Sequence, residues 1–486
     1  MITRRPVPFF TAIILAGSVA GLSSAEERTE RFDKDPGWDG ANNRASTPEK
    51  RTVRQDFGYS RTANAGGKLG EIGGFITPAA ERAYYGRKIE KKTFNDALSA
   101  SGTILCKGAV HLLVGFFNAG TVNEWRTPNT IALRIQGRGE VFFAYVEYTT
   151  SKWRAGGDSP GGFATLKDAK TGRTTLRGFK DGVALPWSIK YAPAGNNGGG
   201  AVTVTVGEET AVCHLDAGHK ADGATFDRFG LVPVLKSADS GGEVWLDDVT
   251  INGAKDDFAK DPEWEGVGNR REYQTADVRP RFDFGFSPTN HAGGKGAGEL
   301  GGLVFRGDCR YKDRLAAYGD RLSALTLDKP LKASGKVALR RGVSDSTVLL
   351  GFYHSEDSLA VNPAQSSGFP KSFLGVVMEG PSREGFLFYP AYRVRGDGQG
   401  YANGADRPHI LPDGKSHDWS LTYDPTAAGA RGRMVVTFDG KSVSLDLAAG
   451  DRKTGARFDR FGLVTTWIDG NAQRVYFDDL TYTSGP

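Results

Sequence analysis

Short runs in which apolar and polar residues alternate, separated by glycine-rich turns, recur along the whole chain. Between Ile131 and Gln136 every second residue is a large aliphatic one, so one face of a strand would be apolar and the other would carry Arg134 and Gln136. Amphipathic helical patterns are scarce, and 66 of the 486 residues are glycine. Many short strands with frequent turns predict an all-β fold of the antiparallel sandwich or jelly-roll type. Further strand-like runs lie at 141–148, 202–206, 348–353, 373–378 and 434–438.

The second half of the chain restates the first. The stretch Phe32–Trp38 returns 226 residues later as Phe258–Trp264, and Phe226–Val232 returns 232 residues later as Phe458–Val464. A period this long indicates a duplicated domain rather than a solenoid repeat of about 20–50 residues. Other matched segments are 56–60 with 283–287, 65–68 with 292–295, and 244–250 with 475–481.

The duplication predicts two tandem, homologous, antiparallel β-sandwich or jelly-roll domains, at 26–253 and 254–486. Because the copies match from end to end, we expect each to form its own sandwich, with its first and last segments adjacent. Only a short polar turn at 252–257 separates the copies, so the two domains are expected to pack as a fixed pair.

Each copy closes on an Arg-Phe-Gly-Leu-Val run followed by a strand with an Asp-Asp pair, at 228–232 with 244–250 and at 460–464 with 475–481. After a glycine-rich β unit, this pattern resembles the concanavalin A-like lectin/glucanase superfamily, the laminin-G-like jelly rolls. It is also similar to secreted bacterial proteins built as tandems of such domains. The resemblance implies a jelly roll whose last strand closes the sandwich near the first. It implies no particular reaction, because the chain shows no lectin or glucanase active-site motif.

The first 25 residues have the parts of an export signal: Arg4 and Arg5, an apolar stretch at 9–22, and small residues at 23–25. The sequence therefore predicts a secreted or periplasmic protein, and no later stretch is long and apolar enough for a membrane span.

A formal net charge of +5 without a basic block argues against a nucleic-acid partner. The three cysteines, at 106, 213 and 309, are too few for a disulfide scaffold, and their pairing stays open.

The densest group of chemically versatile side chains lies in the first copy. If 130–136 and 141–148 pair as a hairpin, one face carries Arg134, Gln136, Tyr145 and Glu147. A saccharide groove needs aromatic rings that stack on sugars, with arginine, amide and carboxylate groups that bind hydroxyls. The alternative is the solvated outer face of an antiparallel sheet. The residues with predicted substrate-binding roles are Trp125, Arg126, Arg134, Gln136, Trp153 and Arg154.

This cluster leads to the hypothesis of a polysaccharide-interacting protein with its glycan-binding groove on the first domain. The alternative is a glycoside hydrolase or polysaccharide lyase that uses the same groove, with Glu147, Glu124 and Tyr145 as candidate catalytic residues. A hydrolase would need two carboxylates about 5–5.5 Å apart for retention, or about 6.5–9.5 Å for inversion. A third alternative is a structural or adhesion protein of the cell envelope.

The second copy does not keep this cluster. Its run 373–379 has no evident counterpart of Arg134 or Gln136, and Tyr389, Tyr392, Arg393, Arg395, Tyr401, Arg407 and His409 follow instead. We expect the principal site in the first copy; the alternative, which the sequence leaves open, is that the two copies bind different ligands.

Two histidines of the second copy replace asparagines of the first. His291 stands where the first copy has Asn64, and His354 where it has Asn118. Such residues beside a tyrosine would suit β-elimination by a lyase. A structural or surface histidine is the alternative.

Aspartates recur near both ends of each copy. A structural Ca²⁺ prefers carboxylate and carbonyl oxygens, and Asp35, Asp247, Asp261 and Asp478 are its candidate ligands. The alternative is hydrogen bonding of these carboxylates to turn amides. No other cofactor is predicted, since no spacing of cysteine and histidine indicates zinc.

Overall fold

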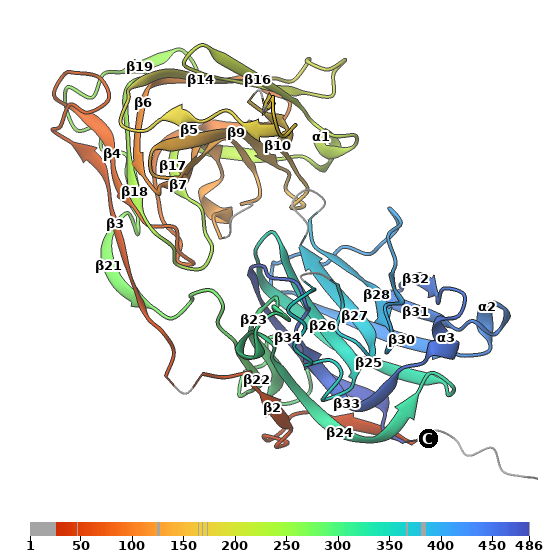
Figure 1. Cartoon of the computed structure of the whole chain (residues 1–486). Helices are drawn as coiled ribbons and strands as arrows, with labels where there is room; N and C mark the ends of the chain where they lie inside the picture. The colour runs from red at the N-terminus through yellow and green to blue at the C-terminus, as the bar shows by residue number, and fades with distance from the viewer. Residues whose placement is uncertain are drawn as a thin grey trace, which may run out of the picture.

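The computed structural model describes residues 26–45, 47–123, 127–163, 165–167, 169–172, 174–365, 368–380 and 385–485. The export signal predicted at 1–25 lies outside these residues. The described chain is almost entirely β and forms two antiparallel sandwiches, one above the other in Figure 1. The predicted all-β fold class is confirmed.

The first sandwich has two sheets. Sheet 1A has the order β10 (Ala155–Gly162), β9 (Val141–Thr149), β8 (Thr130–Gly137), β7 (His111–Phe117), β17 (Thr225–Pro233), β5 (Tyr84–Thr93) and β20 (Glu265–Val267), with β13 (Phe179–Lys180) beside β9. Sheet 1B has the order β16 (Glu209–His214), β15 (Ala201–Val206), β14 (Leu185–Ala192), β6 (Leu98–Gly108), β18 (Gly242–Ile251), β4 (Glu71–Ile76), β3 (Arg51–Ser60) and β21 (Arg270–Thr275), with β19 (Ala254–Asp256) beside β18. A separate hairpin joins β11 (Thr165–Lys167) to β12 (Thr174–Leu176).

The second sandwich repeats this plan. Sheet 2A has the order β2 (Asp39–Ala41), β24 (Ala317–Thr326), β33 (Arg457–Val464), β26 (Ser346–Tyr353), β27 (Phe373–Gly380), β28 (Leu387–Arg393) and β29 (Gln399–Tyr401). Sheet 2B has the order β22 (Asp283–Ser287), β23 (Glu299–Phe305), β34 (Ala472–Thr483), β25 (Leu331–Gly342), β30 (Ser416–Asp424), β31 (Arg433–Phe438) and β32 (Lys441–Asp446), with β1 (Glu27–Glu30) beside β34. The helical pieces are single turns: η1 (Ala119–Thr121), α1 (His219–Asp222), η2 (Lys312–Arg314), α2 (Ala427–Ala430) and α3 (Asp451–Thr454).

The alternation along the strands builds each core. In β8 the side chains of Ile131, Leu133 and Ile135 are buried with residues of sheet 1B. The opposite face of β8 carries Ala132, which belongs to a second apolar cluster with Val122 and Val234. All three cysteines are free and buried, so the structure contains no disulfide between Cys106 and Cys213.

The first segment of each copy belongs to the sandwich of the other copy. Strand β2 pairs with β24, placing Asp39 opposite Gly319, and β1 pairs with the last strand, β34. Reciprocally, β20 pairs with β5, placing Glu265 opposite Gly86, and β21 pairs with β3. Figure 1 shows the red β2 with the second sandwich and the green β21 beside β3. The expectation that each copy keeps its own first segment is therefore wrong.

The repeated aromatic residues of the exchanged segments anchor these segments in the hydrophobic cores. Phe32 and Trp38 are buried in the core of the second sandwich, whereas Phe258 and Trp264 are buried in that of the first. At Gly298, which has φ +126°, a Cβ atom would lie 1.9 Å from the carbonyl oxygen of Phe32. Only glycine allows this close approach, and Gly70 receives the carbonyl of Phe258 in the same way.

Candidate functional site

The predicted hairpin of the first copy forms. Strands β8 and β9 pair with Arg134 opposite Tyr145 and Ala132 opposite Glu147, so these side chains share one face of sheet 1A, together with Gln136. The hydroxyl of Tyr145 donates to Oε1 of Gln136 at 3.4 Å. The alternation in the sequence thus predicted both the pairing and the shared face.

This face is not the open groove that we expected. Arg134, Tyr145 and Glu147 are only 3%, 6% and 1% exposed. Nε of Arg134 lies 2.8 Å from Oε2 of Glu147, and its guanidinium lies 4.0 Å from the centre of the Tyr145 ring. The physical reason for the burial is that apolar segments at 119–122 and 232–235 pack on this face around Ala132. A carboxylate buried in such an ion pair is not placed to protonate a glycosidic oxygen, so the geometry does not support a catalytic Glu147.

The other predicted residues of the first copy are dispersed. Trp153 is half-buried and packs against the core of the second sandwich, so it is a contact between the two halves rather than an exposed platform. Arg154 forms an ion pair with Asp222 and lines a cavity at the junction of the halves. Three further predicted residues, Glu124, Trp125 and Arg126, lie outside the described residues.

The four candidate metal ligands do not converge. The carboxylates of Asp35 and Asp261 each accept a hydrogen bond from the backbone N–H two residues further on, both at 2.9 Å, which is the turn-amide alternative. Asp247 and Asp478 are buried on β18 and β34, where each accepts the N–H of the next residue at 2.7 Å.

Among the described residues, each buried aspartate has one close acidic neighbour that is also buried, Glu71 in the first sandwich and Glu299 in the second. Burial, more than these neighbouring charges, raises the pKa of Asp247, and it raises the pKa of Asp478 to about 7. Ca²⁺ takes about 6–8 oxygen ligands, and the described residues form no group of three or more acidic, histidine or cysteine side chains placed to hold a metal. The described residues therefore do not complete a calcium site.

The second sandwich has a cavity of about 220 Å³ at the position where the first copy has its buried cluster. It opens on sheet 2A, where β26, β27, β28 and β29 lie side by side. Its lining combines three aromatic rings with a carboxylate, a guanidinium and an amide: Phe369, Tyr389, Tyr401, Glu379, Arg306 and Gln399, with Thr347, Gly368, Thr466 and Ile468. This combination has the composition that we predicted for the first copy.

The polar groups of this cavity hold one another in place. The hydroxyl of Tyr389 donates a hydrogen bond to Oε2 of Glu379, and Nη2 of Arg306 lies 3.7 Å from Oε1 of the same carboxylate. Nε of Arg306 donates to Oγ1 of Thr347 at 2.8 Å. Burial, together with the Glu379 charge and hydrogen bond, raises the pKa of Tyr389 well above its ordinary value, so this phenol stays protonated.

The aromatic wall depends on a buried arginine. Tyr401 is 49% exposed, and its ring centre lies 6.1 Å from those of both Tyr389 and Phe369. The backbone carbonyl of Phe369 accepts a hydrogen bond from Nη1 of Arg393 at 2.8 Å, while the Arg393 guanidinium packs 4.7 Å from the centre of the Trp467 ring. These contacts fix the loop that carries Phe369 against sheet 2A.

The strand register shows why the two copies differ here. Tyr389 occupies the position of Tyr145, and Glu379 that of Gln136, so the view that Gln136 has no counterpart was wrong. The buried pair Arg134 and Glu147 is replaced by Val377 and Ala391. Sequence reasoning noted Tyr389 and Tyr401 but missed Glu379, Arg306 and Phe369, because insertions before β27 obscured the register.

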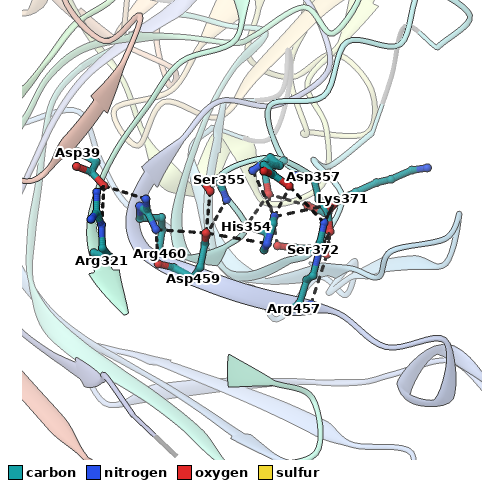
Figure 2. A network of polar contacts seen from close by, with 12 residues as sticks. Asp39, Arg321, His354, Ser355, Asp357, Lys371, Ser372, Arg457, Asp459 and Arg460 are labelled. Atoms are coloured by element: carbon teal, nitrogen blue, oxygen red, sulfur yellow. Dashed lines mark hydrogen bonds and ion pairs between the residues drawn. The ribbon is translucent and has the colours of Figure 1, made fainter. Parts of the chain in front are cut away.

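The closing Phe-Asp-Arg-Phe-Gly motif has a structural role. In the second sandwich the carboxylate of Asp459 accepts hydrogen bonds from the N–H and the hydroxyl of Ser355, at 2.8 and 2.7 Å, and Arg460 pairs with Asp39 of the exchanged β2 at 2.8 Å. Figure 2 shows this chain of contacts from Arg321 and Asp39 to His354 and Asp357. In the first sandwich Asp227 likewise accepts the N–H of Ala119 at 2.9 Å.

The histidines considered for a lyase also have structural partners. Nδ1 of His354 faces the N–H groups of Glu356 and Asp357 at 3.3 and 3.2 Å, and therefore caps a turn as Oδ1 of Asn118 does in the first copy. The backbone N–H of His291 donates to Glu299, as that of Asn64 donates to Glu71. These contacts match the structural alternative for both histidines.

No protein-family model and no curated protein matches this chain. Among solved structures, the chain is similar to domains LG4-5 of the mouse laminin alpha1 chain, with 13% identity and a TM-score of 0.25, over 91% of this chain and 98% of that one. It is also similar to the carbohydrate recognition domain of Emp47p, with 8% identity and a TM-score of 0.25, over 42% of this chain and 89% of that one. A third similarity is to the family 18 polysaccharide lyase aly-SJ02, with 9% identity and a TM-score of 0.18, over 46% of this chain and 93% of that one. Likenesses of this size carry no ligand or reaction over to this chain. None of the described helices is long and apolar enough to cross a membrane.

Proposed function

We propose that this protein binds a polysaccharide and that the aromatic cavity of the second sandwich is its binding site. The observation that carries the proposal is the convergence of Tyr389, Tyr401 and Phe369 with Glu379 and Arg306 around one cavity. The sequence hypothesis of a glycan-binding protein is kept, but its site moves from the first copy to the second. Secretion or a periplasmic location, inferred from residues 1–25, stays a prediction.

The chemistry of the cavity fits a sugar ring. Aromatic faces favour the apolar C–H faces of pyranose rings, while charged hydrogen-bonding groups bind hydroxyls more strongly than neutral ones. Glu379 offers acceptor oxygens, and Arg306 and Gln399 offer N–H donors. Pockets that enclose a drug-sized ligand measure about 300–1,000 Å³, so this smaller cavity suits one ring or a chain end.

The test begins with a screen of the protein on a glycan array. The glycans that bind are then titrated in free solution by calorimetry. Tyr401→Ala should weaken binding by roughly 5-fold to 150-fold, because removal of an exposed aromatic anchor usually costs about 1–3 kcal/mol. The matched control is Tyr311→Ala, which removes a tyrosine that is 47% exposed and lines no part of this cavity. Equal losses from both variants, or none from either, would place the site elsewhere.

A polysaccharide lyase is the second candidate function. The observation that favours it is the contact of Tyr389 with Glu379 beside Arg306, because β-elimination needs a group that neutralises a uronate and a proton-transfer pair. A hydrolase with two carboxylates is less well supported, since Glu379 is the one acidic residue among the described residues that line the cavity. Tyr389→Phe would separate the functions: a lyase would lose its unsaturated product, whereas a binder would keep most of its affinity.

A further inference from the structure

A second cavity, of about 330 Å³, lies at the junction of the two sandwiches. The first sandwich contributes Arg154 and His219, and the second contributes Leu387, Arg407, His409 and the loop 403–405. Of the described residues that line it, none is acidic, while two are arginines and two are histidines. The cavity therefore has the donors that recognise an oxyanion.

Arg154 is held in position at this cavity. Its Nη2 donates to the carbonyl of Ala217 at 3.0 Å, and its Nε lies 3.2 Å from Oδ2 of Asp222. The same carboxylate also receives Lys152, at 3.6 Å. One carboxylate thus faces two cations, and Asp216 is a further acidic neighbour of His219 on this wall.

Arg407 connects the junction cavity to the aromatic cavity. Its Nε donates to the carbonyl of Gly404 at 3.0 Å, and its guanidinium lies 5.2 Å from the centre of the Tyr389 ring. Leu387 of the junction cavity and Tyr389 of the aromatic cavity are two residues apart on β28 and therefore lie on the same face of sheet 2A. The two cavities therefore lie on the same face of sheet 2A.

His219 adds a neutral imidazole to the same wall. Burial, followed by the charge of Arg154, lowers its pKa, and its Nδ1 lies 3.0 Å from the hydroxyl of Tyr148. His409 stands opposite this wall, where its backbone pairs with Leu387.

We infer that the junction cavity is a subsite for an anionic substituent of the bound glycan, a uronate carboxylate or a sulfate ester. This inference rests on the proposed function, because it extends the glycan from the aromatic cavity into the junction. Guanidinium groups match the paired oxygens of carboxylates and sulfates in geometry as well as in charge. The substrate class is therefore acidic polysaccharides, and both sandwiches take part in binding.

The experiment compares two matched pairs of probes by calorimetry: oligogalacturonate with its methyl ester, and dextran sulfate with dextran. Arg154→Gln and Arg407→Gln should each weaken binding of a charged probe by roughly 10-fold, a loss typical of one hydrogen bond to a charged group. They should change the affinity for the uncharged partner by less than about twofold. Arg407→Lys should restore part of the loss, and thermal melts confirm that each variant is folded. The control is Arg61→Gln, an exposed arginine of the first sandwich that lines neither cavity.

The outcomes separate the two proposals. Preference for a charged probe, lost in the Arg154 and Arg407 variants alone, supports the subsite, and the preferred pair distinguishes uronate from sulfate. Equal binding of charged and uncharged probes that depends on Tyr401 overturns the subsite but keeps the proposed function. An equal loss in Arg61→Gln means non-specific attraction and also overturns the subsite. If Tyr401→Ala has no effect on any probe, the proposed function itself fails.

Discussion

Arg460 reaches across 421 positions of sequence to pair with Asp39, at 2.8 Å between Nη2 and Oδ2. Arg228 and Glu265 form the equivalent pair in the first sandwich, at 2.5 Å. In the repeat, Arg228 matches Arg460 and Glu265 matches Asp39. Each arginine of the closing motif therefore fastens the segment that has come from the other copy. The closing motif thus contributes an ion pair that holds the two sandwiches together.

Trp38→Ala should destabilise the second sandwich, although position 38 lies in the first copy. Loss of a buried tryptophan usually costs about 3–5 kcal/mol, and Trp38 packs on Phe32, Tyr318 and Tyr482. Hydrogen exchange should show lost protection in β24, β33 and β34. Trp264→Ala is the matched variant and should act on β5 and β17. If Trp38→Ala instead lost hydrogen-exchange protection in β5 and β17, that result would contradict the exchange of segments.

Glu147→Gln should act on stability rather than on glycan binding. Removal of one partner of a buried ion pair usually costs about 3–5 kcal/mol, because the other charge stays buried. The denaturant midpoint should fall, while affinity measured on the folded fraction should stay within about twofold of the original. If Glu147→Gln kept its denaturant midpoint of unfolding but lost glycan binding, the binding site would lie in the first copy after all.

Trp153→Ala should loosen the junction of the sandwiches. Its side chain packs on the core of the second sandwich, and partial truncation of such a contact costs about 1–3 kcal/mol. The melting temperature should fall by several degrees. No change in the melting temperature, with weaker glycan binding, would instead support an exposed platform at this position.

Asp478→Asn should remove part of the pH dependence of stability. Burial raises the pKa of this carboxyl from 3.8 to about 7 in the folded state. Between about pH 4 and 7 the folded protein then holds a proton that the unfolded chain has lost, so stability falls as the pH rises through this range. The variant should be more stable than the original protein by about 1–3 kcal/mol at pH 8, and nearly equal to it at pH 4.

Melts of the original protein and the variant across this pH range check the prediction. Asp247→Asn is the matched variant in the first sandwich, where burial also raises the pKa. The same melts with calcium and with a chelator test the calcium hypothesis. A calcium-dependent rise in melting temperature that disappears in Asp478→Asn would support it.

The strands were predictable because alternation is local, and β8 and β9 pair and share a face as their sequences indicate. The burial of Arg134 and Glu147 was not predictable, since it depends on two segments distant in the sequence from β9, at 119–122 and 232–235, that pack on that face. The exchange was hidden for a different reason. A repeat shows which positions are equivalent, such as Trp38 and Trp264. Because equivalent segments can pack into either sandwich, the repeat does not show in which sandwich each segment lies. Glu379 was missed because loops of different length precede β8 and β27.

The exchange of segments sets an order of assembly during synthesis. The first sandwich has all its strands once residue 275 has been made. The second cannot close at that point, because β1 pairs with β34, which ends at Thr483. Strand β1 therefore pairs with a strand made more than 400 residues later, whereas β2 can pair with β24 once residue 326 has been made. Until the second sandwich forms, Phe32 and Trp38 have no core in which to be buried. A chaperone that shields this segment should therefore speed folding, and a truncated chain should leave the segment exposed to aggregation.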